Sequence, residues 1–481
     1  MQTRHLTIAV AIALSAATSA HAATAADTGA STDAALSAQT LDTVSVIGQG
    51  ETRQVQRITT VDKQVLPPGT SGQKILDRLP GVSVQSNDAF GANEESQTIS
   101  LRGFDKSRLG YTLDGIPLGD NSYGNYNSAI GYASMYYNTT GYYNTANGFY
   151  TLAYNSSGYG NTAMGMYSGA LNTTGNNNTS LGYQSLYSSY ASSNNTAVGA
   201  FAALSTTNKG SNNTAIGFEA LNKNTTGYSN VAVGTDALYS NTVRGNLVAV
   251  GDSALFNNGV GAAAGQASFN TAIGSKALMA NNLGSNNSAL GFLALQSNSN
   301  GNSNTAMGSY AMNQITSGDH NTAVGHNALS VANTSNDNTA IGFASLSKNT
   351  TGNNNTATGS SSLAANTTGS MNAANGFEAL TANTTGADNT AMGNASLKGN
   401  TTASFNTAMG SEALTTNTTG ANNTGIGYQA LTRNTTAANN SALGYRSLTA
   451  NTTGTNNTAI GSTAGTGNTS GSANTAEGTL S

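Results

Sequence analysis

A unit of 17 residues repeats along this 481-residue chain from about residue 128 onward. Its core reads Asn-Thr-Ala, then an apolar residue, then an anchor glycine, and successive anchor glycines lie 17 residues apart in 18 of 20 steps. The exceptions are the steps from Gly199 to Gly217 and from Gly251 to Gly274, of 18 and 23 residues. A short fixed period indicates one small unit stacked many times rather than a globular core. The repeat favours a surface, binding or structural role over catalysis.

The composition excludes several kinds of functional site. Charged residues make up 8% of the chain, and the net charge of −4 is not concentrated, so we expect no nucleic-acid partner. There is no Cys, which excludes disulfides and thiolate metal sites. His320 and His326 lie near Asp319 in the sequence but lack a further ligand, and acidic residues do not recur in the repeat. We therefore predict no catalytic, cofactor or metal site, and no enzyme.

The core of the repeat predicts short strands. Helix is disfavoured because every turn would contain Gly and β-branched Thr. The clearest cores run from Asn213 to Gly217, from Asn338 to Gly342 and from Asn457 to Gly461, with the inner pairs Ala215 and Ile216, Ala340 and Ile341, and Ala459 and Ile460. In a strand, neighbouring residues point to opposite faces, so Ala and the apolar residue occupy different faces. Both faces are non-polar, so we expect one to be covered by the coil itself and the other by a second copy of the chain.

These patterns predict a mostly β fold, with a parallel β-solenoid of about 21 coils in residues 128–481 that assembles as an oligomer. We expect the recurring Asn to form a ladder in which each side-chain amide donates to the next coil. The anchor glycine is expected either to allow tight packing or to adopt positive φ. The Thr residues are placed mostly in loops, which disfavours an ice-binding face. Exposed Tyr residues in the early repeats have two interpretations, a binding surface or a cap on the first coils.

The first 127 residues differ from the repeats, with 9 Lys/Arg and 12 Asp/Glu. Residues 1–22 have a basic start, a short apolar stretch and an Ala20-His21-Ala22 cleavage site, which predicts a secretory signal peptide. Residues 23–40 are predicted to be a flexible linker. Residues 41–127 then predict strands at 82–85 and 98–102, a helix at 71–79, and a hairpin at 111–118 that turns at Asp114-Gly115.

Three motifs in this segment resemble the plug domain of TonB-dependent outer-membrane receptors: Ile75 to Val84, Ile99 to Phe104 and Leu113 to Pro117. The resemblance implies a partial α+β plug domain. It also implies a TonB box, an extended peptide that pairs with an edge strand of the periplasmic TonB protein. The box residues would be Asp42, Thr43, Val44, Ser45 and Val46. The repeats do not have the 9–11-residue strands of a membrane barrel, so we expect the plug to be truncated and transport by this chain alone to be doubtful.

The repeat cores also resemble the head repeats of trimeric autotransporter adhesins, which form a parallel β-roll wound as a trimer. This resemblance implies a homo-oligomer, with a trimer favoured, that binds a surface ligand. The usual repeat of that family is shorter, near 14 residues. The repeat of this chain is longer because its Asn-Thr-Thr-Gly loop is extended.

Three functional hypotheses follow. The first is an exported structural or adhesive protein at the outer membrane or cell surface of a Gram-negative bacterium, or in the periplasm if it is unanchored. The second is a plug-only component of TonB-dependent uptake of a siderophore or other nutrient. The third is a chimeric reading frame joined near residue 127.

Overall fold

The computed structural model describes residues 126–205 and 210–479, together with the backbone of six short strands nearer the N-terminus. The signal peptide predicted at 1–22, the linker at 23–40, the helix at 71–79 and the hairpin turn at Asp114-Gly115 lie outside the described residues. The chain divides into two compact units, residues 1–177 and residues 178–481.

The first unit contains three antiparallel strand pairs before its coils begin. The strands expected at 82–85 and 98–102 are present and pair with each other, and two short strands pair in the region of the expected hairpin. A further pair joins the strand at the proposed TonB box to a strand that the sequence did not predict. The six strands are β1 (Val44–Ile47), β2 (Val55–Ile58), β3 (Val82–Gln85), β4 (Thr98–Leu101), β5 (Thr112–Leu113) and β6 (Ile116–Pro117).

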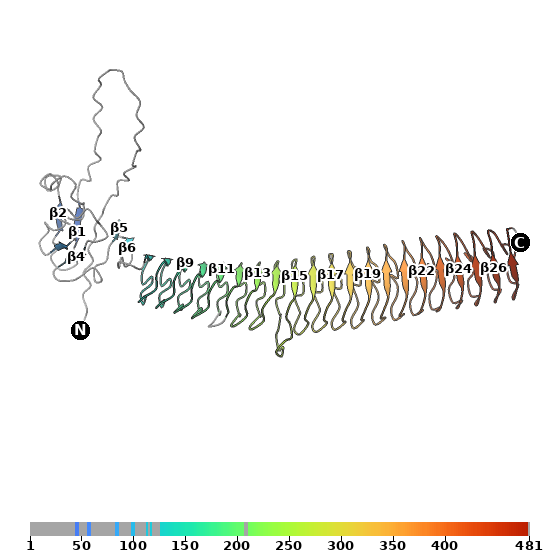
Figure 1. The fold of residues 1–481 in the computed structure, drawn as a ribbon, viewed down its shortest axis with the longest axis horizontal. Coiled ribbons are helices and arrows are strands. Elements are labelled where there is room, and N and C mark those ends of the chain that lie inside the picture. The colour runs from blue at the N-terminus through green and yellow to red at the C-terminus, as the bar shows by residue number, and fades with distance from the viewer. Residues whose placement is uncertain are drawn as a thin grey trace, which may run out of the picture. The chain divides into compact units, whose positions relative to one another are not determined.

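The remaining strands are three residues long, and each belongs to one coil of a parallel β-solenoid. In the first unit they are β7 (Ser128–Ile130), β8 (Thr145–Asn147) and β9 (Thr162–Met164). In the second unit β10 to β27 follow one another in a single row (Figure 1). They are β10 (Thr179–Leu181), β11 (Thr196–Val198), β12 (Thr214–Ile216), β13 (Val231–Val233), β14 (Val248–Val250), β15 (Thr271–Ile273), β16 (Ser288–Leu290), β17 (Thr305–Met307), β18 (Thr322–Val324), β19 (Thr339–Ile341), β20 (Thr356–Thr358), β21 (Ala373–Asn375), β22 (Thr390–Met392), β23 (Thr407–Met409), β24 (Thr424–Ile426), β25 (Ser441–Leu443), β26 (Thr458–Ile460) and β27 (Thr475–Glu477).

The repeat fixes the register of these strands, because each strand pairs with the same positions of the following coil. For example, Ala340 lies beside Ala357, and Ile341 beside Thr358. The predicted parallel solenoid is therefore confirmed.

An anchor glycine follows each strand of the coils. The sequence predicted either tight packing or positive φ for this glycine, and the structure shows both. Gly342 has φ of +133°, which side chains rarely adopt. A Cβ atom there would also lie 2.5 Å from the carbonyl oxygen of Gly359 in the next coil. Only glycine allows the coils to stack this closely at the corner.

The core of each coil is thin and is made from small residues and one leucine. Ala340 on the strand and Leu346 on the turn are both fully buried. The turn is also joined to its neighbour by the backbone, since Leu346 N–H donates to the Ser362 carbonyl at 3.0 Å. Leu346 has φ of +49°, an uncommon conformation for a branched side chain. Burial of the leucine and the backbone bonds to the neighbouring coils hold this conformation in place.

Two ladders of buried asparagine run along the solenoid, one more than the sequence analysis predicted. In the first, Asn338 donates through Nδ2 to Asn321 Oδ1 at 3.1 Å and to the Gly352 carbonyl at 3.0 Å. In the second, which comes from the Asn-Thr-Thr-Gly turn, Asn383 donates to Asn366 Oδ1 at 2.8 Å. The predicted ladder exists, but the direction of its Asn-to-Asn bond was wrong, because each amide donates to the asparagine of the preceding coil, while its other bond goes to a carbonyl 14 residues later in the chain. These amides pair buried polar groups that would otherwise be unsatisfied.

Candidate interaction surfaces

The outer face of the sheet carries two rows of side chains. On strand β19, Ala340 points into the core, whereas Thr339 and Ile341 lie on the opposite, partly exposed face. The same pattern recurs along the strands of the repeat, so one row is mostly Thr and the other mostly apolar. The Thr of the repeat core therefore lies on a strand and not in a loop, which corrects the expectation from the sequence. The coil itself covers the inner face, as predicted, and the outer face is open to solvent in the single chain, so its covering by a second copy stays a prediction.

The apolar row recurs on most coils of the second unit. Nine of its side chains are 39–49% exposed. Single exposed apolar residues are ordinary, but a contiguous row is typical of a binding surface. Its most exposed members are Ile216, Ile273, Leu290, Met307, Ile341, Met392, Met409, Leu443 and Ile460.

The coils of the first unit present tyrosines instead. The Tyr142 and Tyr159 rings stack with centroids 4.9 Å apart, and Tyr137 stacks on Tyr154 at the same distance. Desolvation raises the pKa of Tyr150, and the neighbouring Tyr132 adds to this effect. The rings form aromatic ladders along successive coils, and several are more than a third exposed. Exposed tyrosine is enriched at interfaces, so this surface is a second candidate for binding.

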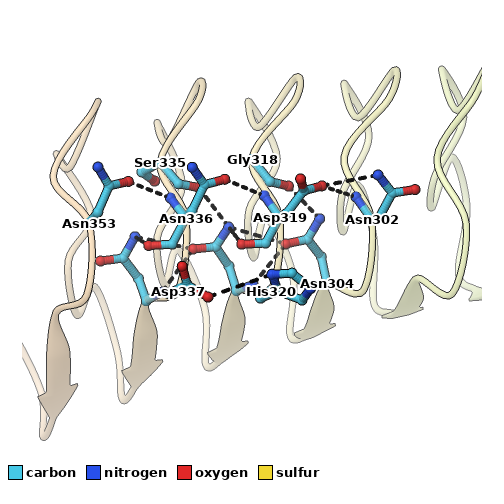
Figure 2. Close-up of polar contacts among 11 residues, drawn as sticks. Asn302, Asn304, Gly318, Asp319, His320, Ser335, Asn336, Asp337 and Asn353 are labelled. Carbon is cyan, nitrogen blue, oxygen red and sulfur yellow. Dashed lines mark hydrogen bonds and ion pairs between the residues drawn. The ribbon is translucent and has the colours of Figure 1, made fainter.

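A third ladder, on the surface, includes the acidic residue that the sequence analysis considered as a metal ligand. Asn302 N–H donates to Asp319 Oδ1 at 2.6 Å, and Asp319 N–H donates to Asn336 Oδ1 at 2.7 Å. Figure 2 shows these side chains in line, with one residue from each coil. The Asp319 carboxylate thus takes the place that an asparagine amide or a serine hydroxyl takes in other coils. Its role there is to accept a backbone hydrogen bond.

The two histidines beside Asp319 are not brought together. His320 Nδ1 lies 3.6 Å from Asp337 Oδ1, and both side chains are more than half exposed (Figure 2). The His326 ring stacks on Phe343 with centroids 5.7 Å apart. In residues 126–205 and 210–479, no three His, Cys, Asp or Glu side chains group as metal ligands would. Within the same part of the chain, no helix has the length and apolarity that crossing a lipid bilayer requires.

The repeat between Gly251 and Gly274 is longer than the others, and the buried side chain of Arg244 binds the inserted loop. The Arg244 side chain donates through Nη2 to the carbonyls of Ala262 and Ala263, at 2.8 and 2.7 Å. Arg244 itself is only 9% exposed. The same coil has Leu247 where the first asparagine ladder would continue, so the two irregularities coincide. Arg244 therefore has a structural role, because it donates hydrogen bonds to two carbonyls of the inserted loop.

The proposed TonB box is only partly within the described residues. Asp42 and Thr43 lie outside them, whereas Val44, Ser45 and Val46 belong to β1. Strand β1 pairs antiparallel with β2, and Ser45 lies opposite Arg57. No other described strand pairs with β1, so one edge of this two-stranded sheet has no partner among the described strands. The predicted repeat residues, such as Asn213, Gly217, Asn457 and Gly461, build the coils and do not converge on a ligand site.

Comparison with known proteins gives one match. Residues 49–160 match the model of the TonB-dependent receptor plug domain. The match covers less than a quarter of the chain and begins after the proposed TonB box. It extends to residue 160, although the solenoid coils begin with β7 at Ser128. Comparison with curated proteins and with solved structures gave no match.

Proposed function

We propose that this protein is an exported structural or adhesive protein whose solenoid assembles with further copies of itself through the outer face of its sheet. The observation that carries the proposal is the exposed apolar row on β10 to β27. The signal-like residues 1–22 and the plug match are consistent with a Gram-negative outer membrane or cell surface. The remaining surface of each coil would then meet the external ligand.

The energetics favour association along many coils. Full burial of an Ile, Leu or Met side chain stabilises by about 1.5–3 kcal/mol, so covering the exposed two-fifths contributes about 0.6–1.2 kcal/mol per coil. Nine such coils contribute about 5–11 kcal/mol, which is comparable with the ~4–15 kcal/mol lost on association. A few coils would not hold two copies together, whereas a long row would.

Sedimentation of the full chain tests this assembly. We expect an oligomer, and a trimer is the state that the resemblance to adhesin heads implies. Replacing Met307, Ile341 and Met392 by Thr, the residue that the chain itself has at position 358, should leave the coils folded and yield monomers.

The matched control removes apolar surface from a different part of the coil. Phe269, Met371 and Phe405 are 59–61% exposed and precede the anchor glycine by five residues, a position at which nine other coils have Asn. Replacing all three by Asn should leave the oligomer intact. A wild-type chain that sediments as a monomer would reject the proposal.

A second candidate function is a role in TonB-dependent uptake of a siderophore or another nutrient, and the plug match favours it. Docking to TonB would add a strand to the open edge of the β1–β2 pair. Replacing both Ser45 and Val46 by Pro removes backbone donors along this strand, so binding of the full chain to the TonB C-terminal domain should be lost. The milder change Ser45→Thr should preserve it, and a wild-type chain that does not bind would exclude the docking role.

The third hypothesis, a chimeric reading frame, concerns the change of composition near residue 127. The plug match continues past this residue, so it gives no sign of a junction there. Sequencing this region from source DNA tests the hypothesis directly.

A further inference from the structure

The apolar row of the second unit has one internal interruption. Among its described coils, a polar residue replaces the apolar one at Thr358, Asn375 and Glu477. Thr358 and Asn375 lie on the neighbouring strands β20 and β21, directly beside each other in the sheet. Ile341 precedes this polar pair in the row and Met392 follows it, so the pair has an apolar residue on each side.

The interruption has no role in the fold of a single chain. Ala374, between the exposed residues of β21, is buried like its equivalents, and Gly393 N–H still donates to the Asn375 carbonyl at 2.8 Å. The Thr358 hydroxyl and the Asn375 amide make no hydrogen bond with the residues that the structure describes. Asn375 is exposed on the outer face of its strand. The coil would therefore accept an apolar residue at this position.

A uniform apolar row cannot by itself align two copies. Coils repeat at a spacing of about 4.8 Å, and sliding one copy by a coil places nearly identical side chains opposite each other. Apolar contact is non-directional, so the slipped arrangements would have similar stability. A polar residue in an apolar seam removes this ambiguity, as one buried asparagine does in a coiled coil.

We infer that Thr358 and Asn375 set the axial register between copies of this chain, a conclusion that rests on the proposed assembly through the outer sheet face. When copies are aligned, Asn375 meets the Asn375 of its neighbour, and each amide offers both a donor and an acceptor to the other. Sliding by two to five coils buries both Asn375 amides against apolar side chains without partners.

The same argument sets the relative direction of the copies. With parallel axes, aligning the polar pair of one copy with that of the other aligns every coil. With antiparallel axes, the polar residues meet only when the pairing is centred on β20 and β21, and that pairing leaves the apolar residues of β10 to β13 without a facing strand. The inference therefore commits to parallel copies, in which equal positions face each other.

The test uses engineered cysteines, because the chain has none of its own. Copies with Met307→Cys are assembled with copies with Ile341→Cys, and the full-length mixture is oxidised. These positions are two coils apart, about 10 Å, so a mixed disulfide requires slipped copies. We expect disulfides between equal positions only. In a background with Thr358→Val and Asn375→Ile, mixed disulfides should rise at least tenfold.

The matched control is Asn394→Ile, which makes the same exchange at an exposed residue just after an anchor glycine. It should leave the disulfide pattern of the wild type unchanged. Circular dichroism confirms that each variant keeps its coils.

The possible failures are distinguishable. An oligomer in which mixed disulfides are equally frequent in both backgrounds overturns the register role and leaves the assembly standing. An oligomer that forms only equal-position disulfides in both backgrounds also overturns it, because another feature then sets the register. A chain that sediments as a monomer and forms no disulfide removes both the assembly and the inference.

Discussion

The coils of the first unit and those of the second share one backbone but present different surfaces. In both, a strand of three residues ends at an anchor glycine with positive φ, and a small residue of the strand is buried. Outside this framework, the first unit exposes stacked tyrosines such as Tyr137 and Tyr154, whereas the second exposes a row of Ile, Leu and Met. The inner positions are dictated by coil geometry, so the outer positions are where the two units can differ in partner.

The largest expected loss of stability comes from replacing an anchor glycine, because the coils of both units depend on this residue equally. Gly342→Ala would place a Cβ 2.5 Å from a backbone oxygen at φ of +133°, and Gly148→Ala would place one 2.7 Å away at +141°. We expect a loss of at least about 4 kcal/mol in either unit, since neither the backbone nor its neighbour can move aside. Urea unfolding measures the loss.

Gly467→Ala is the control for this prediction. A Cβ there meets no atom within 4 Å, and Gly467 is not among the residues with positive φ. This variant should unfold like the wild type. Equal stability of Gly342→Ala and Gly467→Ala would contradict the account of the corner.

The next largest effect comes from the leucine of the core. Leu346 is fully buried, so Leu346→Ala should destabilise by about 2–5 kcal/mol through lost apolar contact and a cavity. Leu152 has the same place in the first unit and is 2% exposed, so its replacement by Ala should cost a similar amount.

Met371→Ala is the counterpart on the surface. Met371 also has positive φ, at 58°, but it is 59% exposed. We expect less than about 0.5 kcal/mol for this change, as for most exposed residues. If thermal unfolding gives the same loss for Met371→Ala and Leu346→Ala, burial of the leucine is not what stabilises the coil.

The second asparagine ladder sharpens the comparison between inner and outer positions. Asn366 donates to Asn349 Oδ1 at 2.8 Å and to the Gly369 carbonyl at 2.9 Å, and it accepts from Asn383. Asn366→Ala leaves the buried Asn349 Oδ1 without this donor and the Asn383 amide without this acceptor, whereas the Gly369 carbonyl still accepts from Asn355. We therefore expect a loss of about 2–3 kcal/mol in chemical unfolding.

The chain supplies its own comparison for this ladder. Ile315 and Ala332 occupy the equivalent position in two successive coils and are both fully buried, so the ladder position accepts apolar side chains. Asn366→Ile should therefore cost less than Asn366→Ala, because it fills the space. The reverse order would show that the hydrogen bonds outweigh packing at this position.

Much of the solenoid could be predicted from the sequence because its constraints are local and repeat with the chain. The spacing of Gly342 and its equivalents gives the coil, and the alternation of Ala340 and Ile341 assigns the two faces. The second ladder could have been recognised from the recurrence of Asn349, Asn366 and Asn383 at the same period. It was missed because Asn-Thr-Thr-Gly is also typical of an exposed turn.

The remaining features depend on contacts between coils that no single unit contains. Asp319 was considered as a metal ligand, but its place in a surface ladder is set by Asn302 and Asn336 of the neighbouring coils. The pairing of His320 with Asp337 likewise joins two coils. The loop satisfied by Arg244 arises from an insertion that has no equivalent elsewhere, so periodicity gave no information about it.

The smallest expected effect concerns two carboxylates in successive coils. Desolvation raises the pKa of Asp236, and repulsion from Asp252 adds to this effect. Because the pKa in the folded state is above its unfolded value, protonation favours the folded chain, and this contribution is lost as the pH rises through the folded-state pKa. Asp236→Asn should therefore be more stable than the wild type at pH 7, by less than about 0.5 kcal/mol after solvent screening. Below the ordinary pKa of about 4 the two should converge, apart from any constant offset, and thermal unfolding at both pH values measures the change. A difference that does not change between the two pH values would show that the carboxylate charge at this position does not affect stability.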